Sequence, residues 1–229
     1  MTVPGHRGPL LIACALGIER LALRRFGDAT ARTDGADGRD GRVTVLRTGM
    51  GAQAAGSAVA RALRDEREPG STAVVATGFC AGLLPGMHPG DLVVADETRD
   101  AEGRTECTGT RLLAEALRPH GTVHVGPLAG SSHIVHGLTR AALHTTTAAV
   151  AADMESAATL RTATLAPGEA AGAAERKRPV AAVRVVVDAP GHELIRLGTL
   201  RGGISAFRVL RGIMPAFLEW HRSLLLPRR

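Results

Sequence analysis

The chain has 229 residues, a length that suits one large α/β domain with a substantial core. Hydrophobic residues make up 45% of it and aromatic residues only 2%, so we expect a globular protein with an aliphatic core. The formal net charge is +6, but Lys177 is the only lysine, and the arginines are scattered with no basic block beyond ERKR at 175–178 and the final two residues. Scattered arginine in a chain rich in alanine and glycine indicates compositional bias and argues against nucleic-acid binding.

The cysteines and histidines predict neither a disulfide framework nor a metal site. Cys14, Cys80 and Cys107 show no close pairing and no CxxC spacing. His133 and His136 lack a nearby partner of ligand type, so no metal is expected. The apolar run PLLIACAL is too short to span a bilayer, and we interpret it as a buried strand rather than a signal. A reducing cytoplasm fits these features best.

Aliphatic runs bounded by glycine recur along the chain and predict strands that are buried on both faces of a sheet. In chain order they are LLIACAL, VTVLRTG, TAVVATGFC, DLVVAD and VAAVRVVVD. Helical patterns separate several of them, most clearly GAQAAGSAVARALRDE, TRLLAEALR, TRAALHTT and MESAATLRTAT. This order predicts a layered α/β fold with a mainly parallel or mixed sheet, in one domain over residues 1–229.

Two segments have the composition of flexible surface, namely DATARTDGADGRDGR at 28–42 and APGEAAGAAERKR at 166–178. The C-terminal stretch ISAFRVLRGIMPAFLEWHRSLLL places apolar residues at helical spacing, and Pro215 should interrupt that helix. It is either a helix that closes over the sheet or a basic amphipathic helix that contacts a membrane surface or an apolar ligand.

The stretch AADMESAAT at 151–159 predicts a helix whose opening residues are unexpectedly charged, because alanine is the best helix former and aspartate a poor one. Two interpretations stay open for Asp153 and Glu155. They lie in a solvated first turn, where the helix dipole favours negative charge, or they face a pocket and bind a polar ligand.

Ligands of open α/β sheets bind at the carboxyl ends of the strands, so the residues just after each apolar run are candidate site residues. They include Glu19, the glycine pair Gly49 and Gly51, and the segment TGFCAGL. Glycines there allow a ligand to approach the amides that open the next helix. Asp188 ends an apolar strand just before a Pro-Gly turn, which suits a general acid that works near neutrality, although capping of that turn explains it equally well.

The segments ALGIE, RTGMG, ATGFCAGLLPGMHPGDLVVADE, AADMESAAT and PVAAVRVVVD resemble, in that order, the nucleoside phosphorylase and nucleosidase superfamily over nearly the whole chain. The most specific elements are GDLVVADE and the Met-Glu pair that is followed by an apolar strand ending in Asp. DMES together with IMPAFLEW most resembles the hopanoid-associated phosphorylase branch, which removes adenine from adenosylhopane. The resemblance implies a three-layer α/β fold in which helices flank a central mixed, mostly parallel twisted sheet.

The resemblance also implies roles for individual residues. Asp188 matches the acid that protonates N7 of the departing purine, and Glu19 matches the group that activates the attacking water. Glu155 matches the carboxylate that accepts hydrogen bonds from the ribose hydroxyls, with Met154 packed against the sugar. Two separated carboxylates with opposite protonation states share the work of glycosidic cleavage in the same way elsewhere.

Further substrate contacts are implied by the same resemblance. Phe79 and Cys80 match the wall beside the base, and Gly49 and Gly51 match positions near the nucleophile and the ribose. His133 is expected to line the pocket for the base or for a substituent of the sugar.

Two departures from the superfamily bear on the chemistry. Val187 stands where adenine-specific nucleosidases usually have a serine that supports the acid. The N-terminal GDPxR-like loop that cradles phosphate in phosphorylases is not reproduced, and Glu19 would repel a phosphate dianion. Arg47 or Arg184 could compensate, although Arg184 within an apolar strand is equally a structural ion-pair residue. Hydrolysis is therefore favoured over phosphorolysis; phosphate is the alternative co-substrate, and no cofactor is expected.

The sequence thus predicts an enzyme that cleaves the N-glycosidic bond of a 5′-substituted adenosine, with adenosylhopane as the leading substrate. Alternatives are a methylthioadenosine/adenosylhomocysteine or futalosine type nucleosidase, and a non-catalytic nucleoside-binding homologue. An apolar tail would approach along the C-terminal helix and LLPGMHP, which would also allow peripheral membrane contact. A cytoplasmic homodimer is expected from the resemblance.

Overall fold

The computed structural model describes residues 8–30, 42–66, 70–166, 177–190 and 199–224. Most of the predicted surface segments 28–42 and 166–178 lies outside these ranges. The strands are β1 (Leu10–Cys14), β2 (Val43–Arg47), β3 (Ala73–Gly82), β4 (Leu92–Asp100), β5 (Gly103–Glu106), β6 (Val123–Gly130), β7 (Ala151–Asp153) and β8 (Val180–Asp188). The helices are α1 (Gly17–Thr30), α2 (Ala52–Leu63), α3 (Thr110–Leu117) with the 3₁₀ turn Arg118–His120, α4 (Leu138–Thr147), α5 (Ser156–Leu165), α6 (Thr199–Gly212) and α7 (Met214–Ser223).

The strands form one mixed sheet in the order β2-β1-β3-β7-β6-β4-β5. Most neighbouring pairs are parallel, and the antiparallel ones are β3 with β7, β4 with β5, and β4 with β8. Because β8 pairs with both β3 and β4, the strands β3, β7, β6, β4 and β8 close into a ring. The predicted mixed, mostly parallel sheet is confirmed, whereas the ring closure had no signal in the strand patterns.

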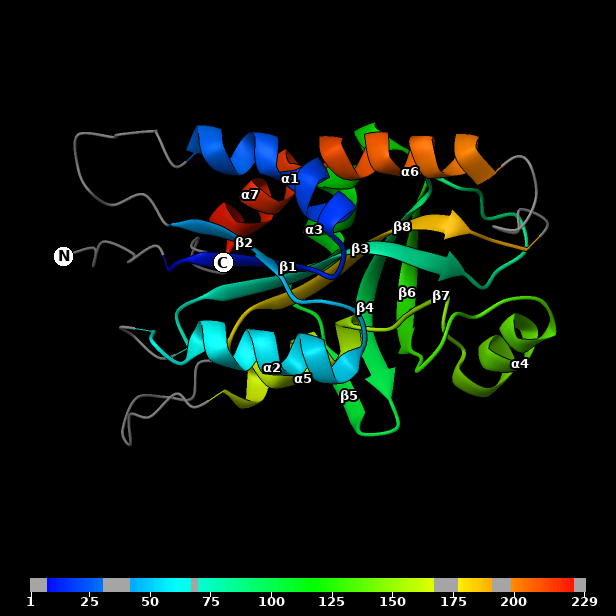
Figure 1. Ribbon diagram of the computed structural model, residues 1–229, viewed down its shortest axis with the longest axis horizontal. Coiled ribbons are helices and arrows are strands. Elements are labelled where there is room, and N and C mark those ends of the chain that lie inside the picture. The colour runs from blue at the N-terminus through cyan, green and yellow to red at the C-terminus, as the bar shows by residue number, and fades with distance from the viewer. Residues whose placement is uncertain (1–7, 31–41, 67–69, 167–176, 191–198, 225–229) are drawn as a thin grey trace.

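Two hydrophobic clusters fill the space between the sheet and its helices, and alternate residues of each strand supply them. In β1, Leu10 and Ile12 face α1, α3, α6 and α7, whereas Leu11 and Ala13 face α2 and α5. Figure 1 shows these two groups of helices on opposite sides of the strands. The three-layer arrangement is therefore confirmed, with both faces of the central strands buried.

The C-terminal helices close over the sheet, which is the first of the two interpretations of this segment. The helix is interrupted between α6 and α7, just before Pro215, as the sequence predicts. Five large apolar side chains of this segment are buried in the core: Leu210, Ile213, Met214, Phe217 and Trp220. Membrane contact through this helix therefore finds no support, and no described helix is long and apolar enough to cross a bilayer.

The second predicted surface segment, 166–178, is buried at its last residue. Arg178 is buried and forms a bidentate ion pair with Glu66, with bonds of 2.6 and 2.7 Å. The same guanidinium donates to the carbonyl oxygens of Thr72 and Ala163. Burial raises the pKa of Glu66, but the hydrogen bonds from Arg178 and Thr72, together with the charge of Arg178, hold this pKa below its ordinary value. The predicted segment 166–178 thus extends too far, because its last residue anchors the start of β8.

The stretch AADMESAAT is only partly helical. Ala151–Asp153 forms the short strand β7 between β3 and β6, and α5 begins at Ser156. The prediction of a helix over the whole stretch is wrong at its start, since pairing of β7 with two strands overrides the helical preference of alanine. The sheet thereby places Asp153 at a strand end and not in a solvated helical turn.

Candidate functional site

Strand β3 positions the candidate site because it pairs with β8 along its length and with β7 at its end. Gly78 of β3 lies opposite Arg184, and Ala81 lies opposite both Ala152 of β7 and Asp188 of β8. The pairing with β8 shifts by one residue at this point, and Val187 is the extra residue. Such a bulge re-aims the side chain that follows it, here Asp188.

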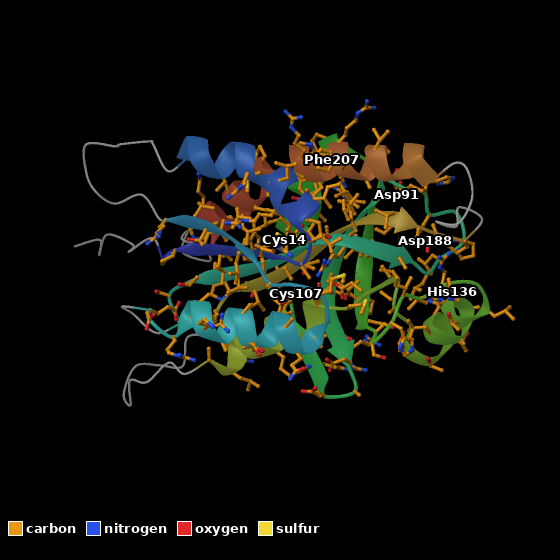
Figure 2. All side chains as sticks on the ribbon, in the orientation of Figure 1. Cys14, Asp91, Cys107, His136, Asp188 and Phe207 are labelled. Carbon is orange, nitrogen blue, oxygen red and sulfur yellow. The ribbon has the colours of Figure 1, made fainter. Side chains whose placement is uncertain are left out.

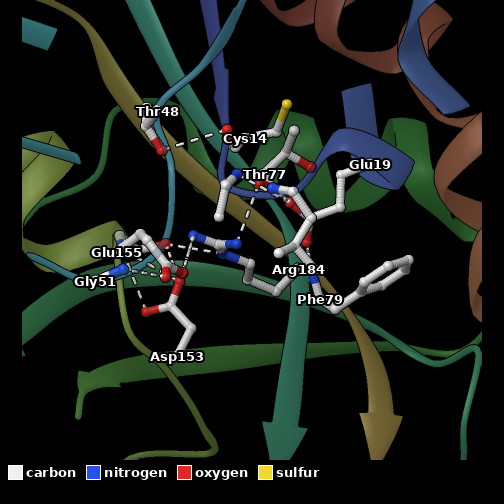
Figure 3. Close-up of polar contacts among 12 residues, drawn as sticks. Cys14, Glu19, Thr48, Gly51, Thr77, Phe79, Asp153, Glu155 and Arg184 are labelled. Carbon is white, nitrogen blue, oxygen red and sulfur yellow. Dashed lines mark hydrogen bonds and ion pairs between the residues drawn. The ribbon is translucent and has the colours of Figure 1, made fainter. Parts of the chain in front are cut away.

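Glu19 is anchored at the start of α1 by backbone amides. Its Oε2 accepts the N–H groups of Ala15 at 2.9 Å and Leu16 at 2.8 Å, and its Oε1 accepts the N–H of Phe79 at 2.8 Å. These three bonds hold the buried carboxylate against β3 (Figure 3). An ionised carboxylate offers about four acceptor sites, so roughly one remains with which this fixed group can orient a water molecule.

Gly78 lets Glu19 and Arg184 approach the same point of β3. Its φ of 135° lies in the range that favours glycine. A Cβ at this position would overlap Glu19 Oε1 and would lie 2.7 Å from Arg184 Nη1. The glycine is therefore required by both its backbone conformation and the close approach of two charged side chains.

Arg184 is a fully buried cation surrounded by acceptors, and 1% of its side chain is exposed. Its guanidinium forms an ion pair with Asp153 and donates to Ser156 Oγ at 2.9 Å and to the carbonyl oxygen of Thr77 at 3.0 Å (Figure 3). Burial lowers the pKa of Arg184, but Asp153, Glu155 and Glu19 raise it above its ordinary value. Of the two interpretations of Arg184, the structure favours the ion-pair residue, since its donors are engaged inside the protein.

Asp153 is buried and has a partner, so the interpretation of a solvated acid is wrong. Its carboxylate pairs with Arg184 and accepts the hydroxyl of Ser156 at 2.6 Å and the Ser156 N–H at 3.2 Å. The bond to the Ser156 N–H still stabilises the first turn of α5. Asp153 therefore joins the end of β7, the start of α5 and the cation on β8.

Glu155 lies beside this pair with fewer contacts. Its Oε1 accepts the N–H of Gly51 at 2.8 Å, and its Oε2 lies 4.0 Å from Arg184 Nη2. Gly49 and Gly51, both with φ near 90°, flank Met50 in the turn that opens α2. Burial raises the pKa of Glu155, and the nearby Arg184 and the Gly51 N–H oppose this rise only in part. A group placed in this way gains from a ligand that donates hydrogen bonds to it.

Asp188 ends β8 and contacts α4. Its Oδ2 lies 2.5 Å from Nη2 of Arg140, and both side chains are buried. Figure 2 shows Asp188 on the side of the molecule where α4 and the segment of His136 lie. Arg140 had no signal in the sequence, because an arginine within the amphipathic pattern TRAALHTT is typical of a solvated helix face. His192, which follows Asp188 in the sequence DAPGHE, lies outside the described residues.

The remaining predicted substrate contacts differ in accessibility. Phe79 and Met154 are half-buried, and the Phe79 N–H is already bonded to Glu19. Cys80 is buried in the cluster that faces α2 and α5, which favours a packing role. His133 is exposed on the segment before α4, where its Nδ1 is 2.7 Å from Ser132 Oγ. No described contact joins His133 to the carboxylates.

Within the described ranges no group of three or more His, Cys, Asp or Glu side chains could hold a metal ion. The cysteines are unpaired thiols, and burial raises the pKa of Cys14 and that of Cys107 to about 12.

Known proteins share this architecture. A family model described as the phosphorylase superfamily matches residues 19–117, and no curated protein matches the chain. Futalosine hydrolase of Helicobacter pylori superposes with a TM-score of 0.72 at 13% identity, covering 93% of this chain and 98% of that one. The 5′-methylthioadenosine/S-adenosylhomocysteine nucleosidase of the same organism gives 0.71 at 14% identity over 94% and 99%. The corresponding nucleosidase of Neisseria meningitidis gives 0.68 at 17% identity over 95% and 99%.

At sequence identities this low, the structural similarity establishes the fold alone. The partial match of the family model covers α1 through α3 and includes Glu19, Gly51 and Gly78. The chain therefore has the α/β fold of nucleoside phosphorylases and nucleosidases, with three carboxylates placed around β3 and β8.

Proposed function

We propose that this protein cleaves the N-glycosidic bond of a 5′-substituted adenosine and releases adenine. The observation that carries the proposal is the gathering of Glu19, Glu155 and Asp188 around two paired strands. Glu19 is bonded to Phe79 of β3, and Asp188 lies opposite Ala81, two residues and about 7 Å further along that strand. Glu155 lies near the same two strands, because its Oε2 is 4.0 Å from Nη2 of Arg184 on β8.

The three carboxylates have environments that suit different roles. As the C1′–N9 bond breaks, its electron pair passes into the purine, and a proton moves from Asp188 to N7. Water adds to C1′ and gives a proton to Glu19, so nucleoside and water become free sugar and adenine. Glu155 accepts hydrogen bonds from the ribose hydroxyls. The amide cage around Glu19 supports this division, since it holds an ionised acceptor in one orientation.

Water is the favoured nucleophile. The Arg184 guanidinium is engaged by Asp153, Ser156 and Thr77, so it is poorly placed to bind phosphate. The carboxylate of Glu19 would repel a phosphate dianion. Phosphorolysis is the alternative because Arg47, at the end of β2 and paired in register with Cys14, is exposed and has a guanidinium to offer.

An apolar 5′ substituent is supported by exposed side chains that neighbour the site residues in sequence. Met50, between the two glycines, is 69% exposed, and Ile18 and Leu21 beside Glu19 are 52% and 61% exposed. We take these residues, rather than the C-terminal helices, as the candidate contact for a tail, because most of the large apolar side chains of those helices pack in the core. Among substrates with such a tail, adenosylhopane is our leading candidate, and methylthioadenosine and futalosine follow.

The proposal is tested by incubating the purified protein with adenosylhopane and with methylthioadenosine, each with and without phosphate, and measuring free adenine. We expect adenine from adenosylhopane without phosphate, and a loss of orders of magnitude in Asp188→Asn. Adenine that forms only with phosphate would contradict the role of Glu19. A protein that binds both nucleosides but cleaves neither would be the non-catalytic homologue.

A further inference from the structure

A buried ion pair joins Arg140 of α4 to Asp188 at the end of β8. The 2.5 Å contact between Arg140 Nη2 and Asp188 Oδ2 involves side chains that are only 3% and 4% exposed. Arg140 Nη2 also lies 3.5 Å from the carbonyl oxygen of Val135, and its Nε is buried without a hydrogen-bond partner in the described part of the chain. The Asp188 carboxyl is the charged partner of this buried guanidinium, and it must take up a proton before it can serve as an acid.

The neighbouring residue on β8 cannot orient Asp188. Val187 is the extra residue of the β-bulge, and its side chain has no polar atom. The side chain of Val187 therefore gives the Asp188 carboxyl no hydrogen bond. Arg140 contacts this carboxyl from α4, through Oδ2.

We propose that Arg140 is a positioning residue for the proton donor, an inference that rests on the proposed function. When the proton moves from the Asp188 carboxyl to purine N7, the carboxyl gains negative charge while the C1′–N9 electron pair enters the base. The guanidinium against Oδ2 stabilises this charge as it develops. Because the neutral acid gains less from the same contact, Arg140 stabilises the transition state more than the bound substrate.

The proposed role of Arg140 predicts different effects of its removal for different leaving groups. A purine must be protonated as it departs, so its release depends on Asp188 and, through it, on Arg140. A 4-nitrophenolate group leaves as a stable anion and needs no proton from the protein. Arg140 should therefore matter for a purine riboside and be irrelevant for 4-nitrophenyl β-D-riboside.

The experiment compares Arg140→Met and Arg140→Lys with the wild-type chain on both ribosides. For the adenine nucleoside we expect kcat of Arg140→Met to fall about 100-fold with little change in KM, as for the loss of one charge-stabilising donor elsewhere. Arg140→Lys should recover most of this loss, because it keeps the cation. Release of nitrophenolate should be unchanged. Arg111→Met, which removes an exposed arginine of α3, is the matched control and should behave as wild type on both substrates.

Other outcomes would overturn the inference. Equal losses on the two ribosides would assign Arg140 a packing role, and so would a failure of lysine to restore adenine release. Full activity of Arg140→Met on the nucleoside would also overturn it. The variant Asp188→Asn distinguishes failure of this inference from failure of the proposed function. If Asp188→Asn releases adenine as fast as wild type, Asp188 is not the acid, and both the proposed function and the role of Arg140 are wrong. If Asp188→Asn is inactive and Arg140→Met is not, only the role of Arg140 falls.

Discussion

Replacing Arg184 by methionine should destabilise the protein strongly, because it leaves buried acceptors without their cation. Arg184→Met keeps most of the side-chain length but removes the ion pair with Asp153 and the donors to Ser156 and Thr77. Breaking a buried pair by removing one partner costs about 3 to 5 kcal/mol. For a chain of this size each kcal/mol lowers Tm by about 2 to 4 °C, so we expect a fall of roughly 6 to 20 °C.

The assay is thermal and urea unfolding of four proteins: wild type, Arg184→Met, Asp153→Asn and the double variant. The double variant should lose less than the sum of the single losses, since the buried charge of Asp153 is then removed together with its cation. Arg111→Met removes an exposed ion pair with Glu115 and should cost less than about 1 kcal/mol. If Arg184→Met were as mild as Arg111→Met, or if the two single losses were additive, Arg184 would not be the cation on which the buried acids depend.

Three further predictions concern the same region. Gly78→Ala should lower both stability and kcat, because the new methyl group displaces Glu19; unchanged adenine release and unchanged Tm would contradict this. Burial raises the pKa of Glu155, so its ionisation in the folded state costs stability, a cost that is absent below the ordinary carboxyl pKa and complete above the raised one. Glu155→Gln should therefore melt higher than wild type at neutral pH, match it in acid, and lose nucleoside binding; melting curves over pH and calorimetric titration decide this. With pKa values of about 12, the thiols of Cys14 and Cys107 should resist iodoacetamide at pH 8 until the protein unfolds, which mass spectrometry can follow.

Strands buried on both faces were predicted well because their sequences have few alternatives. Continuous aliphatic runs such as those of β1, β3 and β8 cannot be solvated, so a layered sheet is the fold that accommodates them. β6 and β7 were missed for a physical reason. β6 contains Pro127 and two glycines, and β7 has three residues in an alanine-rich segment, so their pairing depends on neighbours that are distant in sequence.

The carboxylates of the site were predictable, whereas their cations were not. Glu19 and Asp188 follow apolar strands, and such positions lie at one edge of a sheet. The use of Arg140 to hold Asp188 depends on where a helix from elsewhere in the chain packs, which no local pattern encodes. Arg184 gave an ambiguous signal, because a charge in an apolar strand indicates a buried partner without identifying it.

Two acids separated by one residue, Asp153 and Glu155, have different surroundings in the structure. Asp153 lies in β7 and contacts Arg184 directly, so its charge is compensated inside the protein. Glu155 lies past the end of that strand, 4.0 Å from the same guanidinium, and holds one backbone N–H. Since Arg184 is neutralised mainly by Asp153, Glu155 retains acceptor capacity that only a further donor can satisfy. The ion pair between Asp153 and Arg184 thus keeps a cation near the buried Glu155 without using the acceptor sites of its carboxylate. A ribose with two vicinal hydroxyls is a ligand suited to donate hydrogen bonds to those sites.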